Sequence, residues 1–323
     1  MHWIKYLTAI FLLLVIGLGL WLYQPDLPAT EVDARYSNEQ SKFLQLDNGT
    51  RLHYRDQGNP DGIPIVLLHG AMSSLHTWEP WVGILGADYR VITLDLPGHG
   101  LTGAVPDGDY SADAFTQAID ATVVHLQLEQ FVLGGNSMGG GATWRYTLRY
   151  PDKVSHMLLV ASVGASRQPR PSSNAQQNSP FAPLQWAWFR SVAEHINPRV
   201  LVARGLRSAY NNAPVVDDVL INRYTDLILR QGTRKAILQR AQRPRSQAST
   251  ADLSMLSQPT LILWGAHDAL IPVSVGEQLR DTLADARLVV YEDLGHVPME
   301  EAPQRTAMDV LQFLSEATTP SIR

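Results

Sequence analysis

The chain has 323 residues, 45% of them apolar and 18% charged, which suits one large globular domain with an insertion or two modest domains. The net charge of −5 at pH 7 argues against a nucleic-acid partner, because proteins that bind nucleic acids usually carry a basic surface. The chain has no cysteine, so a thiolate nucleophile, a zinc–cysteine site and disulfide bonds are excluded.

An uncharged segment opens the chain. No residue from Tyr6 to Tyr23 is charged, and as a helix these 18 residues would be about 27 Å long, close to the thickness of the hydrocarbon core of a bilayer. We therefore predict that residues 1–24 form a transmembrane anchor. Lys5 precedes the segment and Asp26 follows it, which places the N-terminus in the cytoplasm and the body of the chain on the periplasmic or extracellular side.

A cleaved signal peptide, which would leave a secreted protein, is the alternative for this segment. Its cleavage site should contain small residues, whereas none of the residues from Trp21 to Pro25 is small. Residues 25–41, which are mostly polar and contain prolines, are typical of a linker.

Strands and helices alternate after the linker. Short apolar or alternating runs that are typical of strands lie at residues 51–55, 65–68, 90–94, 131–133, 154–160, 260–264 and 287–291. Segments with apolar residues at helical spacing lie at residues 112–128, 142–149, 275–283 and 304–314. This alternation predicts a mostly parallel sheet built from strand–helix–strand units.

Residues 165–250 interrupt the alternation. The first part, up to Pro180, is polar and rich in proline, and the remainder has helical character with no clear strand. Such an insertion predicts a helical cap over the carboxyl edge of the sheet, where open α/β sheets bind their ligands. The cap would divide the core into two parts, residues 42–164 and residues 251–323.

A candidate nucleophile follows the strand at residues 131–133. The pattern G-x-S-x-G spans residues 135–139 and has Ser137 at its centre. The chain must turn sharply there, so side chains at the positions of Gly135 and Gly139 would collide with the neighbouring strand and helix. Such a turn projects the serine hydroxyl over the edge of the sheet, and we predict that Ser137 is the nucleophile.

A serine hydroxyl needs a base to take its proton, and the base needs a carboxylate to orient it. Of the ten histidines, His296 is best placed, because it comes just after the last predicted strand. Asp268 follows an earlier strand, so the order Ser137, Asp268, His296 is the one that this type of turn predicts. The rival acids are Asp95, which we expect to organise its own turn, and Asp293, which is too close in sequence to His296.

The tetrahedral intermediate of such a reaction needs N–H donors for its oxyanion. We predict that one is the backbone N–H of Met138, directly after the nucleophile. The second should come from the loop after the strand at residues 65–68, and we assign it to the backbone N–H of Ala71.

Five ordered motifs resemble those of the α/β-hydrolase superfamily. They are His69-Gly70, Asp95-Leu96-Pro97-Gly98-His99-Gly100, the serine turn at 135–139, Trp264-Gly265-Ala266-His267-Asp268 and Gly295-His296. The resemblance covers residues 43–314 and implies the α/β-hydrolase fold: an eight-stranded, mostly parallel sheet flanked by helices, with a helical cap. It also implies hydrolytic activity without a cofactor or a metal. A serine in the turn separates the chain from haloalkane dehalogenases and epoxide hydrolases, which carry aspartate there.

The reaction that we expect is hydrolysis of a small-molecule carboxylic ester through an acyl-enzyme. The serine turn is also similar to that of carbon–carbon bond hydrolases that cleave ring-fission products, which are the main alternative. That fit is incomplete, because residues 71–74 replace a glycine-rich loop and Val297 stands where tryptophan often follows the catalytic histidine. Lactone hydrolysis, perhydrolysis, thioester cleavage and a non-catalytic binding module are further alternatives, and no oligomeric state is predicted.

Overall fold

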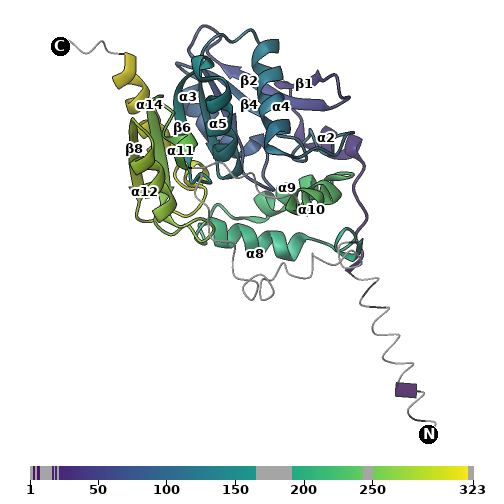
Figure 1. The fold of residues 1–323 in the computed structure, drawn as a ribbon. Coiled ribbons are helices and arrows are strands. Elements are labelled where there is room, and N and C mark those ends of the chain that lie inside the picture. The colour runs from purple at the N-terminus through teal and green to yellow at the C-terminus, as the bar shows by residue number, and fades with distance from the viewer. Residues whose placement is uncertain are drawn as a thin grey trace, which may run out of the picture.

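The computed structural model describes residues 22–164, 191–242 and 250–318, together with residues 3, 6, 7, 17 and 19 nearer the N-terminus (Figure 1). These residues form an eight-stranded sheet with helices on both faces and a further group of helices across one end.

The sheet has the strand order β1-β2-β4-β3-β5-β6-β7-β8. Its strands are β1 (Ser41–Gln45), β2 (Arg51–Gly58), β3 (Pro64–Leu68), β4 (Arg90–Leu94), β5 (Phe131–Asn136), β6 (Val154–Val160), β7 (Thr260–Gly265) and β8 (Ala286–Tyr291). The pairs β1–β2 and β2–β4 are antiparallel, and all pairs from β4 to β8 are parallel. The prediction of an eight-stranded, mostly parallel sheet is therefore confirmed.

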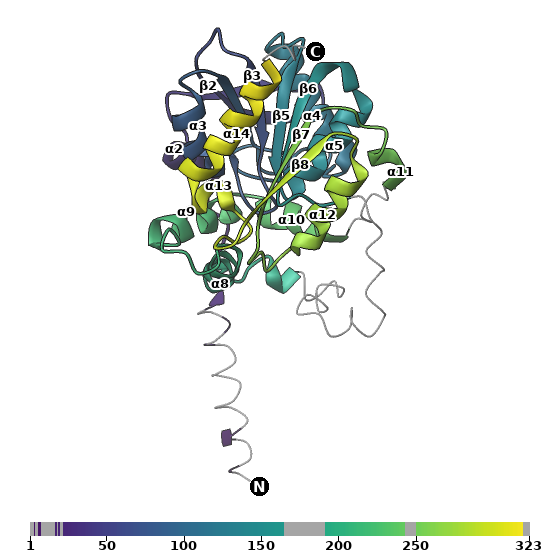
Figure 2. The same cartoon turned by 90° about the vertical axis from the view of Figure 1, so that its left-hand side faces the viewer.

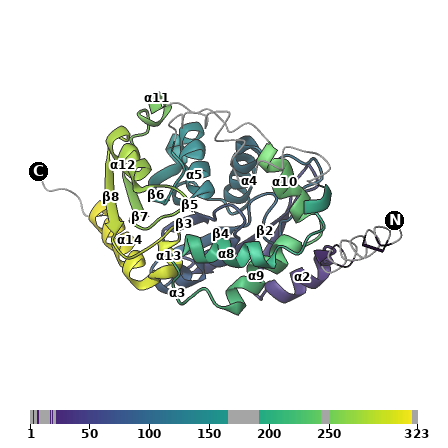
Figure 3. The ribbon, with the colours of Figure 1, turned by 90° about the horizontal axis from the view of Figure 1, so that it is seen from below.

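Strand β3 illustrates why wholly apolar runs form the centre of this sheet. Val66 and Leu68 pack into one core and Ile65 and Leu67 into the other, because successive side chains of a strand point to opposite faces. The helices on the first face are α4 (Ala112–His125), α5 (Met138–Arg149) and α12 (Val273–Thr282), and those on the second are α3 (Glu79–Leu85) and α14 (Pro303–Thr318). Figures 2 and 3 show the sheet between these two layers.

The described part of the predicted cap is helical. It contains α8 (Arg199–Ala209), α9 (Asp218–Leu229) and α10 (Thr233–Gln242), which come between β6 and β7 in the chain, and α11 (Thr250–Leu253) begins at its last residue. Seen along the strands in Figure 3, α8 and α9 lie across the end of the sheet. Residues 165–190 and 243–249 of the predicted cap lie outside the described residues.

The predicted linker contains a helix and packs against the cap. We call residues 22–36 the N-terminal strap; they include α2 (Ala29–Tyr36). Before α2, the strap runs beside the cap in an extended conformation. It donates hydrogen bonds from Gln24 N–H to His195 O (2.7 Å) and from Leu27 N–H to Leu229 O (2.8 Å). Val32 of α2 is fully buried and packs in one apolar cluster with a residue of α9.

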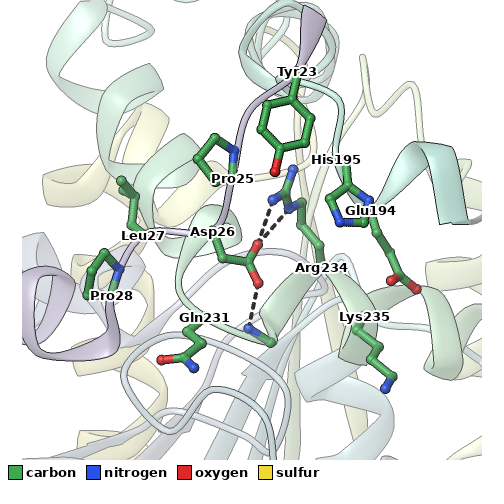
Figure 4. Close-up of a pocket in the computed structure, with 11 residues that line it drawn as sticks. Tyr23, Pro25, Asp26, Leu27, Pro28, Glu194, His195, Gln231, Arg234 and Lys235 are labelled. Carbon is green, nitrogen blue, oxygen red and sulfur yellow. Dashed lines mark hydrogen bonds and ion pairs between the residues drawn. The ribbon is translucent and has the colours of Figure 1, made fainter. Parts of the chain in front are cut away.

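A pocket of about 510 Å³ lies between the strap and the cap (Figure 4). On its floor, the carboxylate of Asp26 accepts two hydrogen bonds from the guanidinium of Arg234, at 2.6 and 2.9 Å, and one from Gly232 N–H at 2.9 Å. Arg234 also donates to the carbonyls of Gln24 and Ile196. One arginine of α10 thus joins the strap to the turn that precedes α8, and none of the predicted catalytic residues lines this pocket.

The predicted membrane anchor, residues 1–24, lies mostly outside the described residues. Within the part of the chain that the structure describes, no helix has both the length and the apolar character needed to cross a bilayer. The anchor therefore stays a prediction.

Candidate active site

Ser137 occupies a strained turn between β5 and α5. Its backbone dihedrals are φ 52° and ψ −111°, in a region that residues other than glycine seldom adopt. Two hydrogen bonds to the end of β6 and the residues after it hold this turn, from Ser137 N–H to Val160 O (2.9 Å) and from Val163 N–H to Ser137 O (3.1 Å). Its neighbours on both sides are buried, whereas Ser137 is partly exposed.

The two glycines of the motif allow close backbone contacts at this turn. A Cβ atom on Gly135 would lie 2.3 Å from the carbonyl carbon of Gly139, and one on Gly139 would lie 2.2 Å from Leu68 O. Both distances are far below van der Waals contact, and the atoms met belong to the backbone. The turn at Ser137 therefore requires glycine at both positions, as predicted from the motif.

His296 and Asp268 are hydrogen-bonded to each other at the ends of β8 and β7. The distance from His296 Nδ1 to Asp268 Oδ2 is 2.7 Å, and the carboxylate is fully buried. The other oxygen, Oδ1, accepts the backbone N–H groups of Leu270 and Ile271 at 2.8 and 2.9 Å. A carboxylate only accepts hydrogen bonds, so Nδ1 carries the hydrogen and Nε2 is left free to act as a base.

The backbone of His296 is tied to the serine turn. Asn136, the residue before Ser137, donates from Nδ2 to His296 O at 3.1 Å and to Val160 O at 3.2 Å. On its other side, His296 N–H donates to Ala209 O, at the end of cap helix α8, at 2.7 Å. The structure thus brings the loop that carries His296 together with the turn that carries Ser137.

Glu301 holds the same loop from a third side. It lies at the end of α13 (Pro298–Glu301), and its carboxylate accepts the N–H groups of Gly295 (2.8 Å) and Val297 (3.1 Å), the residues that flank His296. Burial raises the pKa of Glu301 above its ordinary value. The roles of Glu301 and Asn136 were not predicted, because their side chains bind backbone groups of the loop and no motif identifies such contacts.

The loop after β3 lies beside Ser137. A Cβ atom on Gly70 would be 3.4 Å from Ser137 Cβ. The carbonyl of Gly70 accepts hydrogen bonds from His69 Nδ1 (2.7 Å) and Ser73 N–H (3.3 Å), so it points into the loop. In a trans peptide the next N–H, that of Ala71, points the opposite way, and no described residue accepts a hydrogen bond from it.

Met138, the other predicted oxyanion donor, is the first residue of α5. The N–H groups in the first turn of a helix have no acceptor within the helix, so the N–H of Met138 is available next to the serine. The two predicted donors therefore belong to segments that flank Ser137.

The rival residues have structural roles. His69 is fully buried, its Nε2 accepts Leu96 N–H at 3.0 Å, and burial lowers its pKa. Asp95 is also fully buried and accepts hydrogen bonds from His53 Nδ1 and from the N–H groups of Leu75 and Leu101, so it organises its turn as expected.

Asp293 forms an ion pair at 2.7 Å with Arg305. It lies on the loop that leads to His296, but it bonds away from that histidine. Among the described residues, no group of three or more histidine or acidic side chains is placed to hold a metal ion.

Comparisons with known proteins agree with this architecture. A family model described as alpha/beta hydrolase fold matches residues 63–303. The 2-hydroxymuconate semialdehyde hydrolase of Pseudomonas sp. (strain CF600) is 27% identical over 283 residues, which cover 85% of this chain and 94% of the relative. Lipase 3 of Moraxella sp. (strain TA144) is 25% identical over 326 residues, which cover 95% of this chain and 96% of the relative.

Among solved structures, a thermophilic esterase from Thermogutta terrifontis superposes with a TM-score of 0.69 and 26% identity. The match covers 87% of this chain and 100% of the esterase. The similar proteins thus include a semialdehyde hydrolase as well as a lipase and an esterase.

Proposed function

Because the chain belongs to the alpha/beta hydrolase fold family and its relatives are hydrolases, we propose that it cleaves a small-molecule carboxylic ester. Ser137 is the nucleophile, His296 the general base and Asp268 the acid that orients it. The observation that carries this proposal is the hydrogen bond between His296 and Asp268, on a loop that Asn136 ties to the serine turn.

The reaction begins when His296 Nε2 takes the proton of the Ser137 hydroxyl and Ser137 Oγ attacks the ester carbonyl carbon. The N–H groups of Met138 and Ala71 stabilise the negative charge on the carbonyl oxygen. The tetrahedral intermediate collapses, the alcohol leaves with the proton from His296, and an acyl-enzyme remains. Water, deprotonated by His296, then attacks the acyl carbon, the bond from that carbon to Ser137 Oγ breaks, and His296 returns the proton to Ser137 as the acid leaves.

Two observations favour ester hydrolysis over carbon–carbon cleavage. The alignment with the lipase extends over 95% of the chain, whereas that with the semialdehyde hydrolase covers 85%. The loop after β3 has the residues Ala71, Met72 and Ser73 in place of a glycine-rich sequence, and Val297 follows the candidate base. Carbon–carbon bond hydrolysis is the second candidate, favoured by the 27% identity to the semialdehyde hydrolase.

A fluorophosphonate probe and a substrate panel test the proposal. We expect the probe to label Ser137, and Ser137→Ala to lower kcat by about 10⁵-fold, since the remaining rate comes from binding and the oxyanion donors alone. The panel contains p-nitrophenyl esters, a lactone and a dienoate ring-fission product. Faster turnover of the dienoate than of every ester would favour the second candidate, and an unlabelled Ser137 would leave only a binding module.

The location of the protein is part of the proposal. Residues 1–24 anchor the chain in a membrane, with the hydrolase body on the periplasmic or extracellular side; release after cleavage of a signal peptide is the alternative. The uncharged stretch that supports the anchor ends at Tyr23, whose ring stacks on His195 of the cap at 5.9 Å. A membrane anchor would therefore join the hydrolase body at a point next to the cap.

A further inference from the structure

A chain of partly buried hydroxyl groups connects the cap with the loop after β3. Ser73 Oγ, in the loop after β3, lies 3.0 Å from Tyr224 Oη on cap helix α9. Tyr224 Oη lies 3.3 Å from Tyr210 Oη, at the end of α8, and burial together with the nearby carboxyl group of Glu300 raises the pKa of Tyr210. Glu300 comes four residues after His296 and is buried.

A hydroxyl group can both donate and accept, so in each pair either oxygen can be the donor, and Tyr224 can bond Ser73 and Tyr210 at the same time. Each bond polarises the next, which strengthens this partly buried chain of hydrogen bonds.

The loop after β3, which contains Ser73, adopts a backbone conformation that needs support. Met72 has φ 60°, in the left-handed region, although it is not glycine. Its side chain is 53% exposed, so packing of that side chain contributes little to holding the turn. The next residue, Ser73, closes the turn through its N–H on Gly70 O and bonds Tyr224 through its hydroxyl.

We propose that Tyr224 is a positioning residue for the oxyanion hole. Its hydroxyl holds Ser73, and Ser73 keeps the turn at residues 70–73 in the shape that directs the Ala71 N–H toward the reacting carbonyl. Because Tyr224 belongs to the cap, the oxyanion hole is complete only when the cap is seated on the loop after β3. The inference rests on the proposed function, since it needs an oxyanion at Ala71.

The test is a double-mutant cycle in the full chain with a soluble p-nitrophenyl ester. Tyr224→Phe keeps the ring and removes only the hydroxyl. We expect kcat to fall about tenfold with KM changed less than twofold, a smaller effect than the 10²- to 10³-fold loss of an oxyanion donor itself. Ser73→Ala should give a similar loss, and the double variant should be no slower than either single variant, because both substitutions remove the hydrogen bond between Ser73 and Tyr224.

Tyr36→Phe is the matched control. Its hydroxyl also bonds helix α9, through Asp226 at 2.8 Å, but has no link to the loop after β3. We expect kcat within twofold of the wild type. A similar loss in this control would mean that any hydroxyl holding α9 matters, and would overturn the specific role of Tyr224.

Labelling of Ser137 separates this inference from the function on which it rests. If Tyr224→Phe has full kcat while the wild type is labelled at Ser137, the inference fails and the proposed function stands. Additive losses in the double variant also overturn it, because Ser73 and Tyr224 would then act independently. If ester hydrolysis does not require Ser137, the proposed function and the inference fall together.

Discussion

Three different segments hold the backbone on either side of His296. The cap carbonyl of Ala209 binds its N–H, Asn136 binds its carbonyl, and Glu301 binds the N–H groups of its two neighbours. A base whose ring must meet a serine within hydrogen-bond distance benefits from such support, because small displacements reduce proton transfer strongly. The candidate site thus owes its geometry to residues that carry no chemistry themselves.

At Asp268, the two backbone donors determine what an amide would do. In Asp268→Asn the side-chain oxygen should stay with the N–H groups of Leu270 and Ile271, which turns the NH₂ group toward His296 Nδ1. Nδ1 must then accept, the hydrogen moves to Nε2, and the base is lost. We expect kcat to fall by about 10³- to 10⁴-fold with little change in the melting temperature.

Asp293→Asn is the control for that experiment in the same steady-state assay. Asp293 lies on the loop that leads to His296 but pairs with Arg305. Its amide variant should keep kcat within twofold of the wild type. Equal losses in the two variants would show that the loop, and not the orientation of the imidazole, is affected.

The buried carboxyl group of Glu300 predicts that the stability of the folded chain depends on pH. Burial raises its pKa above the ordinary value of 4.5, so the folded chain holds this proton to higher pH than the unfolded chain does. Stability from this group is therefore lost as the pH rises from about 4.5 through the folded pKa, and is constant above it. Glu300→Gln does not titrate, so its melting temperature minus that of the wild type should rise with pH across this window and then level off.

Thermal unfolding in a series of buffers from about pH 4 to 8 measures that difference. Subtracting the wild type cancels the titration of groups common to both chains. A difference that falls as the pH rises would contradict the expected sign.

At the scale of elements, the N-terminal strap acts as part of the cap. Asp26 is the carboxylate partner of Arg234, whose side chain is only 6% exposed, and Asp33 pairs with Arg230, which is also largely buried. Buried guanidinium groups of the cap thus depend on acids that precede the core in the chain. The position of the cap helices is coupled in this way to a segment that begins where the predicted anchor ends.

Asp26→Ala tests this coupling. The variant leaves the buried guanidinium of Arg234 with carbonyl partners only, and we expect the free energy of unfolding to fall by about 2 kcal/mol. Urea unfolding is the measurement. Glu31→Ala removes an exposed ion pair with Arg35 in the same strap and should cost about 0.5 kcal/mol or less.

For the whole molecule, the position of the strap determines where the chain can be shortened. A chain that begins at residue 22 keeps every described contact between the strap and the cap, whereas a chain that begins at residue 37 loses Asp26, Asp33 and α2. We expect the full chain to sediment with membranes and the chain from residue 22 to remain soluble, with kcat on a short ester unchanged. The chain from residue 37 should melt at a lower temperature.

Fractionation and mass spectrometry of the expressed full chain check the anchor. Recovery of a soluble form whose N-terminus lies near residue 24 would support the cleaved signal peptide instead. Full stability of the chain from residue 37 would show that the strap contacts contribute little.

Local patterns in the sequence were sufficient to predict seven of the eight strands and the sharp turn at Ser137, whereas β1 was not among the predicted runs. Strands buried on both faces must be apolar at every position, so runs such as residues 65–68 are visible without a structure. The need for glycine at positions 135 and 139 was also predicted, because close backbone contacts at the turn leave no room for a side chain. The order of Ser137, Asp268 and His296 also predicted the hydrogen bond between the last two, while their catalytic roles remain proposals.

Only the tertiary structure decided what surrounds those residues. Asn136 meets His296 across 160 positions of sequence, Ser73 meets Tyr224 across 151, and Asp26 meets Arg234 across 208. Such pairs depend on the order of the strands in the sheet and on the position of the cap. Neither of these produces a periodic pattern in the sequence. A polar, proline-containing segment therefore resembles a linker until the folded chain brings its carboxylates against buried arginines.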